Sequence, residues 1–207
     1  MMFTWEFLIL WFGWLIAGGS PGPATLAIAG TAMSRGRRSG FFVSLGILAG
    51  SASWGMAAVF GLSAIMLTNV WLFEMIRYAG AAYLLFLAAK ALRSALKTDV
   101  VSGGTPFNGN AGTLFVKGAL LHLTNPKAVL GWGSYFAVVV PQGASVPDLL
   151  AYAAVLYAGS IVTFVGYAFL FSTERVVRGY ARGRRWFDLT FAGFFGFADV
   201  KILTARP

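Results

Sequence analysis

Six long apolar runs occupy most of this 207-residue chain, and each is long enough to cross a lipid bilayer. A bilayer core about 30 Å thick needs roughly 20 apolar residues in a helix. Hydrophobic residues make up 58% of the chain, charged residues 11%, and the mean hydropathy is +0.74, which leaves too little polar surface to solvate a globule. The sequence therefore predicts an all-α integral membrane protein with six transmembrane helices. The expected spans are Trp5 to Ala29, Phe41 to Met66, Val70 to Leu92, Leu114 to Val140, Leu149 to Phe171 and Trp186 to Leu203.

The first apolar run is expected to remain in the protein as a helix. It carries Glu6, lacks a basic leading segment and, at about 25 residues, exceeds the apolar core of about 7 to 15 residues in a signal peptide. The chain contains no cysteine, which excludes disulfides, thiolate metal sites and thiol redox relays. We expect neither a metal nor a cofactor.

The basic residues are concentrated in alternate loops, and this pattern predicts the orientation in the membrane. The second and fourth loops, residues 67–69 and 141–147, contain no Lys or Arg. By the positive-inside rule, the other three loops face the cytoplasm and both termini lie outside, in a multi-pass protein of the inner (cytoplasmic) membrane. Anionic lipid headgroups suffice as partners for the net charge of +9, and no nucleic acid is expected. The basic residues in or beside these three loops are Arg35, Arg37, Arg38, Lys90, Arg93, Lys97, Lys117, Arg175, Arg178, Arg182, Arg184 and Arg185.

A polar, Gly-rich linker at residues 94–113 divides the single transmembrane domain into two halves, residues 1–93 and 114–207. Each half is expected to contain three spans. Because three is an odd number, the second half must insert upside down relative to the first. The sequence thus predicts an inverted 3+3 repeat, which is common among secondary transporters.

Proline interrupts the first and fourth apolar runs, at Ser20-Pro21-Gly22-Pro23 and at Asn125-Pro126-Lys127. Proline has no amide hydrogen, so within a helix it frees a carbonyl one turn earlier. A new half-helix begins after each break, with Pro23 or Pro126 suited to its first turn and Asn125 suited as an N-cap. Its unpaired amides and positive dipole end attract an anion such as a carboxylate. The freed carbonyls can accept hydrogen bonds from an ammonium group, so one site built from both breaks would suit a zwitterion. Helix kinks without a binding role are the alternative.

The chain resembles the LysE/RhtB superfamily of amino-acid exporters in several motifs. They are SPGPA at 20–24, SRGRRSG at 34–40, a ladder of Gly46, Gly50 and Gly61, and HLTNPKA at 122–128, in the same order over nearly the whole chain. The resemblance implies a proton-driven secondary transporter of amino acids or related metabolites that forms a dimer, with the PGP and NPK segments along the path. The residues expected at the site are Ser20, Pro21, Gly22, Pro23, Ala24, Ser51, His122, Thr124, Asn125, Pro126 and Lys127.

Two positions depart from the pattern of that superfamily. Many members follow PGP with Asn, where this chain has Ala24, and many have an acidic residue where this chain has Ser51. If that carboxylate takes part in proton coupling or in amine binding, its absence leaves the substrate and the coupling ion open.

Two polar residues near the second break have competing interpretations. A charge in an apolar segment costs roughly 2.5 to 3.5 kcal/mol on insertion scales and is functional by default, so Lys127 is expected to balance a substrate carboxylate. Snorkelling and capping of backbone carbonyls are its alternatives. His122, the single histidine, is expected to cap a helix or to pack with a hydrogen bond, and a proton relay is its alternative. Gly46 and Gly50 form a GxxxG motif, which permits close helix packing either within the chain or between two chains.

Enzyme motifs are absent from the sequence. It contains no GxxxxGK[ST] nucleotide loop, no HExxH motif and no nucleophile motif beside the histidine. We therefore expect a non-enzymatic exporter that works by alternating access. The open alternatives are a non-transporting accessory subunit of a membrane complex and a membrane enzyme with an unfamiliar motif.

Overall fold

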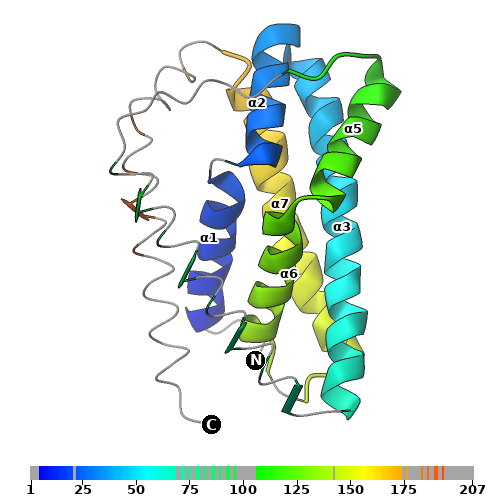
Figure 1. The fold of residues 1–207 in the computed structure, drawn as a ribbon, viewed down its shortest axis with the longest axis vertical. Helices are drawn as coiled ribbons and strands as arrows, with labels where there is room; N and C mark the ends of the chain where they lie inside the picture. The colour runs from blue at the N-terminus through cyan, green and yellow to red at the C-terminus, as the bar shows by residue number, and fades with distance from the viewer. Residues whose placement is uncertain are drawn as a thin grey trace.

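The structure, a computed structural model, describes residues 5–20, 22–68, 106–141 and 143–173, together with scattered positions between 71 and 96 and between 176 and 193. The described residues form helices and connections without any strand, which confirms the predicted all-α class (Figure 1). The expected third and sixth spans, Val70 to Leu92 and Trp186 to Leu203, lie mainly outside the described residues. The helices are α1 (Trp5–Gly19), α2 (Pro23–Arg35), α3 (Arg37–Thr68), α5 (Ala111–Leu123), α6 (Pro126–Val139) and α7 (Val146–Leu170).

Short helices stack end to end in two pairs, and two long helices run beside them. Figure 1 shows α1 continuing into α2, and α5 continuing into α6, with both junctions near mid-height. The members of each pair have 15 and 13 residues, and 13 and 14 residues. At 1.5 Å per residue each short helix is about 20 Å long, so only a stacked pair reaches across a bilayer core. The long helices α3 and α7 each contain a 25-residue stretch apolar enough to cross alone.

The stacked pairs run in opposite directions along the long axis. In the orientation of Figure 1, the chain rises through α1 and α2, descends through α3, descends again through α5 and α6, and rises through α7. The long helix α3 makes its most extensive contacts with α5 and α7, and α1 contacts mainly α7. The long helices thus hold the two stacked pairs in place.

The first basic loop is much shorter than expected. Helix α2 ends at Arg35, and α3 begins at Arg37, with only Gly36 between them. Gly36 has a φ of 83°, a left-handed conformation that glycine adopts at low cost and other residues adopt rarely. The basic residues predicted for this loop therefore lie at the ends of two helices.

Glycines on α3 allow its backbone to approach α5 closely. A Cβ atom on Gly46 would collide with the carbonyl oxygen of Phe115, and one on Gly50 would lie 2.9 Å from the Cβ of His122. Small residues at such crossings let helix backbones pack closely in membrane proteins. Of the two interpretations of the GxxxG motif, the structure therefore supports packing within the chain.

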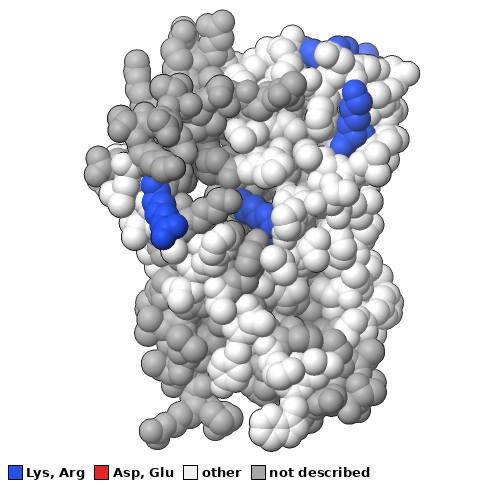
Figure 2. Space-filling model, in the orientation of Figure 1, with Lys and Arg blue, Asp and Glu red and all other residues white. Residues whose placement is uncertain are grey.

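Basic side chains at one end of the molecule bind the connecting segments there. Arg35 Nη1 donates to Asn108 Oδ1 at 2.9 Å, and Lys117 Nζ donates to the carbonyl of Asn108 at 2.9 Å. Arg37 Nε donates to Ser172 Oγ at 2.7 Å. Figure 2 shows Lys and Arg side chains at this upper end. The described part of the third loop is thus anchored beside the start of α3.

Candidate functional site

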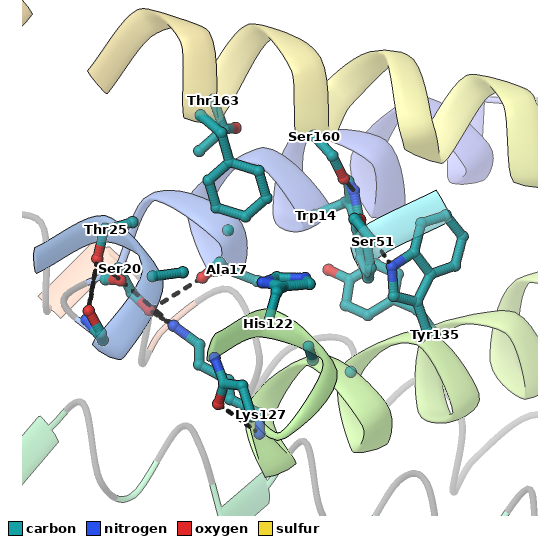
Figure 3. Close-up of a pocket in the computed structure, with 18 residues that line it drawn as sticks. Trp14, Ala17, Ser20, Thr25, Ser51, His122, Lys127, Tyr135, Ser160 and Thr163 are labelled. Atoms are coloured by element: carbon teal, nitrogen blue, oxygen red, sulfur yellow. Dashed lines mark hydrogen bonds between the residues drawn. The ribbon is translucent and has the colours of Figure 1, made fainter. Parts of the chain in front are cut away.

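A cavity lies where the two helix junctions face each other, about halfway along the molecule. We call residues 19–22 the first junction and residues 124–125 the second junction. The cavity encloses about 650 Å³ that protein atoms do not fill, part of it continuous with solvent. The part of this space that is open to the centre of a water-sized sphere is about 60 Å³, enough for several water molecules. Residues from both junctions and from α3 and α7 line it (Figure 3).

The first junction is shaped by local chemistry after the end of α1. Pro23 is the first residue of α2 and has no amide hydrogen to satisfy. The amide of Gly22 donates to Thr25 Oγ1 at 3.0 Å. The same hydroxyl lies 3.2 Å from the carbonyl oxygen of Ser20 and 3.1 Å from that of Gly22. The buried Thr25 therefore ties the first turn of α2 back to the junction.

Side chains from three different places bind carbonyl oxygens around the first junction. Ser20 Oγ donates to the carbonyl of Ala17 at 2.9 Å. The Tyr167 hydroxyl, which comes from α7, donates to the carbonyl of Gly19. Lys127 Nζ, which comes from α6, donates to the carbonyl of Ser20 at 3.3 Å. The carbonyl of Ala17 also accepts from the amide of Ser20 at 3.3 Å, whereas the proline-containing break leaves the carbonyls of Gly19 and Ser20 to be satisfied by side chains.

The second junction satisfies its backbone groups mostly by itself. Asn125 caps α6, as the sequence predicts, because its Oδ1 accepts from the amide of Lys127 at 3.0 Å. The carbonyl of Asn125 accepts from the amide of Ala128 at 2.9 Å, and its own amide donates to the carbonyl of His122 at 3.2 Å. Pro126 is the first residue of α6. This junction is therefore a short, self-contained connection between two helices.

Lys127 links the two junctions across the cavity. Its ammonium donates to Ser20 Oγ as well as to the Ser20 carbonyl, 107 positions away in the sequence (Figure 3). A Cβ atom on Gly22 would lie only 3.5 Å from Lys127 Nζ, so the lysine passes directly over that glycine. Capping of a backbone carbonyl, one of the alternatives for this lysine, is therefore the interaction present in this structure. No Asp or Glu is among the described residues that line the cavity.

His122 lies in the cavity wall between the two ends of the site. Its side chain is buried at 5% exposure and packs edge-on against Phe164, with ring centroids 5.5 Å apart. Within the described part of the chain, its Nδ1 has no hydrogen-bond partner. The hydrogen bond expected for this ring is thus not made at Nδ1.

Aromatic rings form the end of the cavity away from Lys127. Trp14 contacts Trp132 and Tyr135 edge-on, with ring centroids 4.8 Å and 5.0 Å away. The indole of Trp14 donates to Ser160 Oγ at 3.1 Å, and the indole of Trp132 donates to Ser51 Oγ at 3.0 Å. Ser51 therefore serves as a hydrogen-bond acceptor for a wall residue.

Most of the residues expected at the site lie together, and a few do not reach the cavity. Pro23, Thr124 and Pro126 are exposed at helix ends and do not line it, and Pro21 lies outside the described residues. The Thr124 hydroxyl instead donates to the carbonyl of Leu120 at 2.8 Å. The expected residues that line the cavity are Ser20, Gly22, Ala24, Ser51, His122, Asn125 and Lys127.

The contributions of α7 and of the second half of α1 to the site were not predicted from the sequence. Ser160 and Thr163 are hydroxyl residues less than one turn apart in an otherwise apolar helix, and this spacing was the available signal. Trp14 and Phe164 gave no signal, because aromatic residues make up 16% of the chain. Thr25 directly follows the SPGPA motif at 20–24, and its role was not predicted.

Comparison with known proteins gives close matches over most of the chain. The family model described as LysE type translocator matches residues 15–206. Threonine efflux protein of Escherichia coli (strain K12) is 34% identical over 194 residues, which cover 92% of this chain and 94% of that protein. Leucine efflux protein of Salmonella typhimurium (strain LT2) is 36% identical over 116 residues, 56% of this chain and 54% of that protein. No solved structure matches the chain.

Proposed function

This chain belongs to the LysE type translocator family, and we propose that it is a secondary transporter that exports amino acids or related zwitterionic metabolites. The family comprises helical membrane proteins that are transporters and not enzymes. The names of the relatives, threonine efflux protein and leucine efflux protein, support an amino acid as the exported solute.

The observation that carries this proposal is the meeting of both junctions at one cavity, with an ammonium from one beside carbonyl oxygens of the other. A substrate carboxylate would accept hydrogen bonds from Lys127 Nζ, close to the amide-bearing start of α6. A substrate ammonium would donate to the oxygens of Ser20 that Lys127 occupies in this structure. Binding of the zwitterion would thus replace the contact between the Lys127 ammonium and the Ser20 oxygens with two contacts. The substrate carboxylate would bind the Lys127 ammonium, and the substrate ammonium would bind the Ser20 oxygens.

We propose alternating access between two inverted halves as the transport mechanism. In support, α1–α2 and α5–α6 run in opposite directions, and the two junctions lie near mid-height (Figure 1) and contribute residues to the cavity. Rocking of one half against the other would expose the cavity to each side in turn. A proton gradient is the proposed driving force, and His122 is a candidate carrier, because it lines the cavity and its buried Nδ1 has no hydrogen-bond partner within the described part of the chain.

We propose that the protein lies in the inner (cytoplasmic) membrane with its basic end facing the cytoplasm. Arg35, Arg37 and Lys117 are at this end, whereas α1 begins at the opposite end. The positive-inside rule then puts the start of α1 outside. Anionic lipids would contact the basic end, and a homodimer is the proposed assembly.

Efflux from proteoliposomes tests the proposed function. Purified full-length protein would be reconstituted into vesicles preloaded with a labelled amino-acid mixture, with and without an imposed pH gradient. We expect release of particular amino acids, faster with the gradient than without it. Protein-free vesicles give the leak rate, and release no faster than this leak from folded protein would contradict amino-acid export.

A further inference from the structure

We propose that the aromatic end of the cavity is a side-chain pocket that selects uncharged, apolar amino-acid side chains, such as that of leucine, and rejects charged ones. This inference rests on the proposed export function and names the substrate class of the same site. It follows from how differently the two ends of the cavity are built.

The walls of this pocket are rigid, apolar rings from different helices. Trp14 comes from α1, and Trp132 and Tyr135 come from α6, with side-chain exposures of 9%, 2% and 2%. Phe164 from α7 is also buried and lines the cavity. Rings packed edge-on against one another have little freedom to rotate toward a new partner. A substrate side chain at this end therefore meets ring faces and edges.

The indole and serine polar atoms at this end are already engaged. Each indole N–H donates to a serine hydroxyl, Trp14 to Ser160 and Trp132 to Ser51. Ser160 in turn donates to the carbonyl of Leu156 at 3.3 Å. A polar substrate group would have to compete for these atoms, whereas an aliphatic group needs none of them. Burial of a polar group without a partner is costly, and burial of a charge costs far more.

Charge also disfavours ionised side chains at this pocket. The α-carboxylate and α-ammonium of a substrate would be bound at the Lys127 end, so the side chain would extend toward the rings (Figure 3). There, no Asp or Glu is among the described lining residues to balance a lysine or arginine side chain. An aspartate or glutamate side chain would lie at the end opposite the Lys127 ammonium and would be equally uncompensated.

Ser51 and Ser160 are therefore positioning residues, because each accepts the hydrogen bond that occupies the N–H of an indole in the cavity wall. Replacing Ser51 by Ala removes the acceptor of the Trp132 indole. The indole N–H, without rotating, then faces the space that the hydroxyl vacated, which borders the cavity, so a hydroxyl on the substrate side chain that enters this space can accept from it. We expect the variant to favour threonine relative to leucine, in comparison with the unaltered protein.

The test measures efflux of leucine, threonine, lysine and glutamate from preloaded proteoliposomes of the full-length protein. We expect leucine to leave at least about tenfold faster than lysine or glutamate, corresponding to one unsatisfied buried polar group, with threonine between them. Lysine or glutamate efflux as fast as leucine efflux would overturn the pocket assignment while leaving export intact. No efflux of any amino acid would remove both the export function and the pocket.

A matched pair of variants tests the positioning role. Ser51→Ala should lower the leucine-to-threonine ratio severalfold, because one buried hydrogen bond becomes available to the substrate. Ser53→Ala is the control, since Ser53 is exposed on the same helix, donates to the carbonyl of Ala49 and does not line the cavity. An unchanged ratio in Ser51→Ala, or an equal change in both variants, would overturn the role assigned to Ser51.

Discussion

The two helix junctions perform similar geometric tasks but depend on different parts of the chain. At the second junction, Asn125 satisfies the amide of Lys127 with its side chain and the amide of Ala128 with its carbonyl. At the first junction, two carbonyl oxygens depend on side chains more than 100 positions away, because Gly19 is bound by Tyr167 and Ser20 by Lys127. One junction is built locally, and the other is completed by the tertiary fold.

This difference suggests which junction can change during transport. Local hydrogen bonds move with their own helix and persist when halves of the protein shift. Long-range bonds to the first junction must break if α6 or α7 moves relative to α1 and α2. In the proposed mechanism the first junction is therefore the better candidate for the element that opens, and Lys127 would be the contact through which a bound substrate affects both junctions.

Replacement of Lys127 by Met should have the largest effect, because it removes the contact shared by both junctions. A hydrogen bond to a charged group contributes about 1.5 to 3 kcal/mol, so efflux should fall by about tenfold to a hundredfold. Initial efflux rates in proteoliposomes measure this change. Lys117→Met is the control, since Lys117 binds the carbonyl of Asn108 at the basic end, away from the cavity. Unchanged efflux in Lys127→Met would exclude Lys127 from the mechanism.

Replacement of Asn125 by Ala should weaken the second junction alone. Loss of an N-cap side chain costs about 0.5 to 2 kcal/mol, typically about 1 kcal/mol. The matched control is Asn110→Ala, because Asn110 caps α5 by accepting from the amide of Thr113 at 2.9 Å and is exposed outside the cavity. Both variants should lower the thermal unfolding temperature similarly, but only Asn125→Ala should also slow efflux. Equal efflux from the two variants would mean that the cap has no role beyond stability.

Local features of the chain were predictable from the sequence because their physics is local. The expected spans Phe41 to Met66 and Leu149 to Phe171 lie within four residues of the ends of α3 and α7. The capping role of Asn125 also follows from residue type and position alone. Hydropathy and capping depend on residues a few positions apart, so one sequence is enough to predict these spans and this cap.

The partners of the site residues were not predictable, because they depend on how each helix is rotated about its axis. Helix α7 is apolar on all sides, so its pattern does not distinguish a face toward lipid from a face toward the protein. The role of Tyr167 was therefore not predictable, and the spacing of Ser160 and Thr163 could at most indicate a polar position on α7 without naming its partner. The sequence likewise left open whether Lys127 caps a backbone carbonyl or balances a substrate carboxylate. In this structure Lys127 caps the carbonyl of Ser20.

Replacement of Tyr167 by Phe should have the smallest effect, and it separates the first junction from the second. The variant removes the hydroxyl that binds the carbonyl of Gly19 while keeping the ring that stacks on Phe171. One neutral hydrogen bond contributes about 1 kcal/mol, so amide exchange should accelerate about fivefold near the first junction and stay unchanged near Asn125. Hydrogen-exchange mass spectrometry of peptides covering each junction measures this contrast, with Tyr157→Phe on the same helix as the control. Equal acceleration at both junctions would mean that they are coupled in one cooperative unit, and the distinction between a locally built and a tertiary-built junction would not hold.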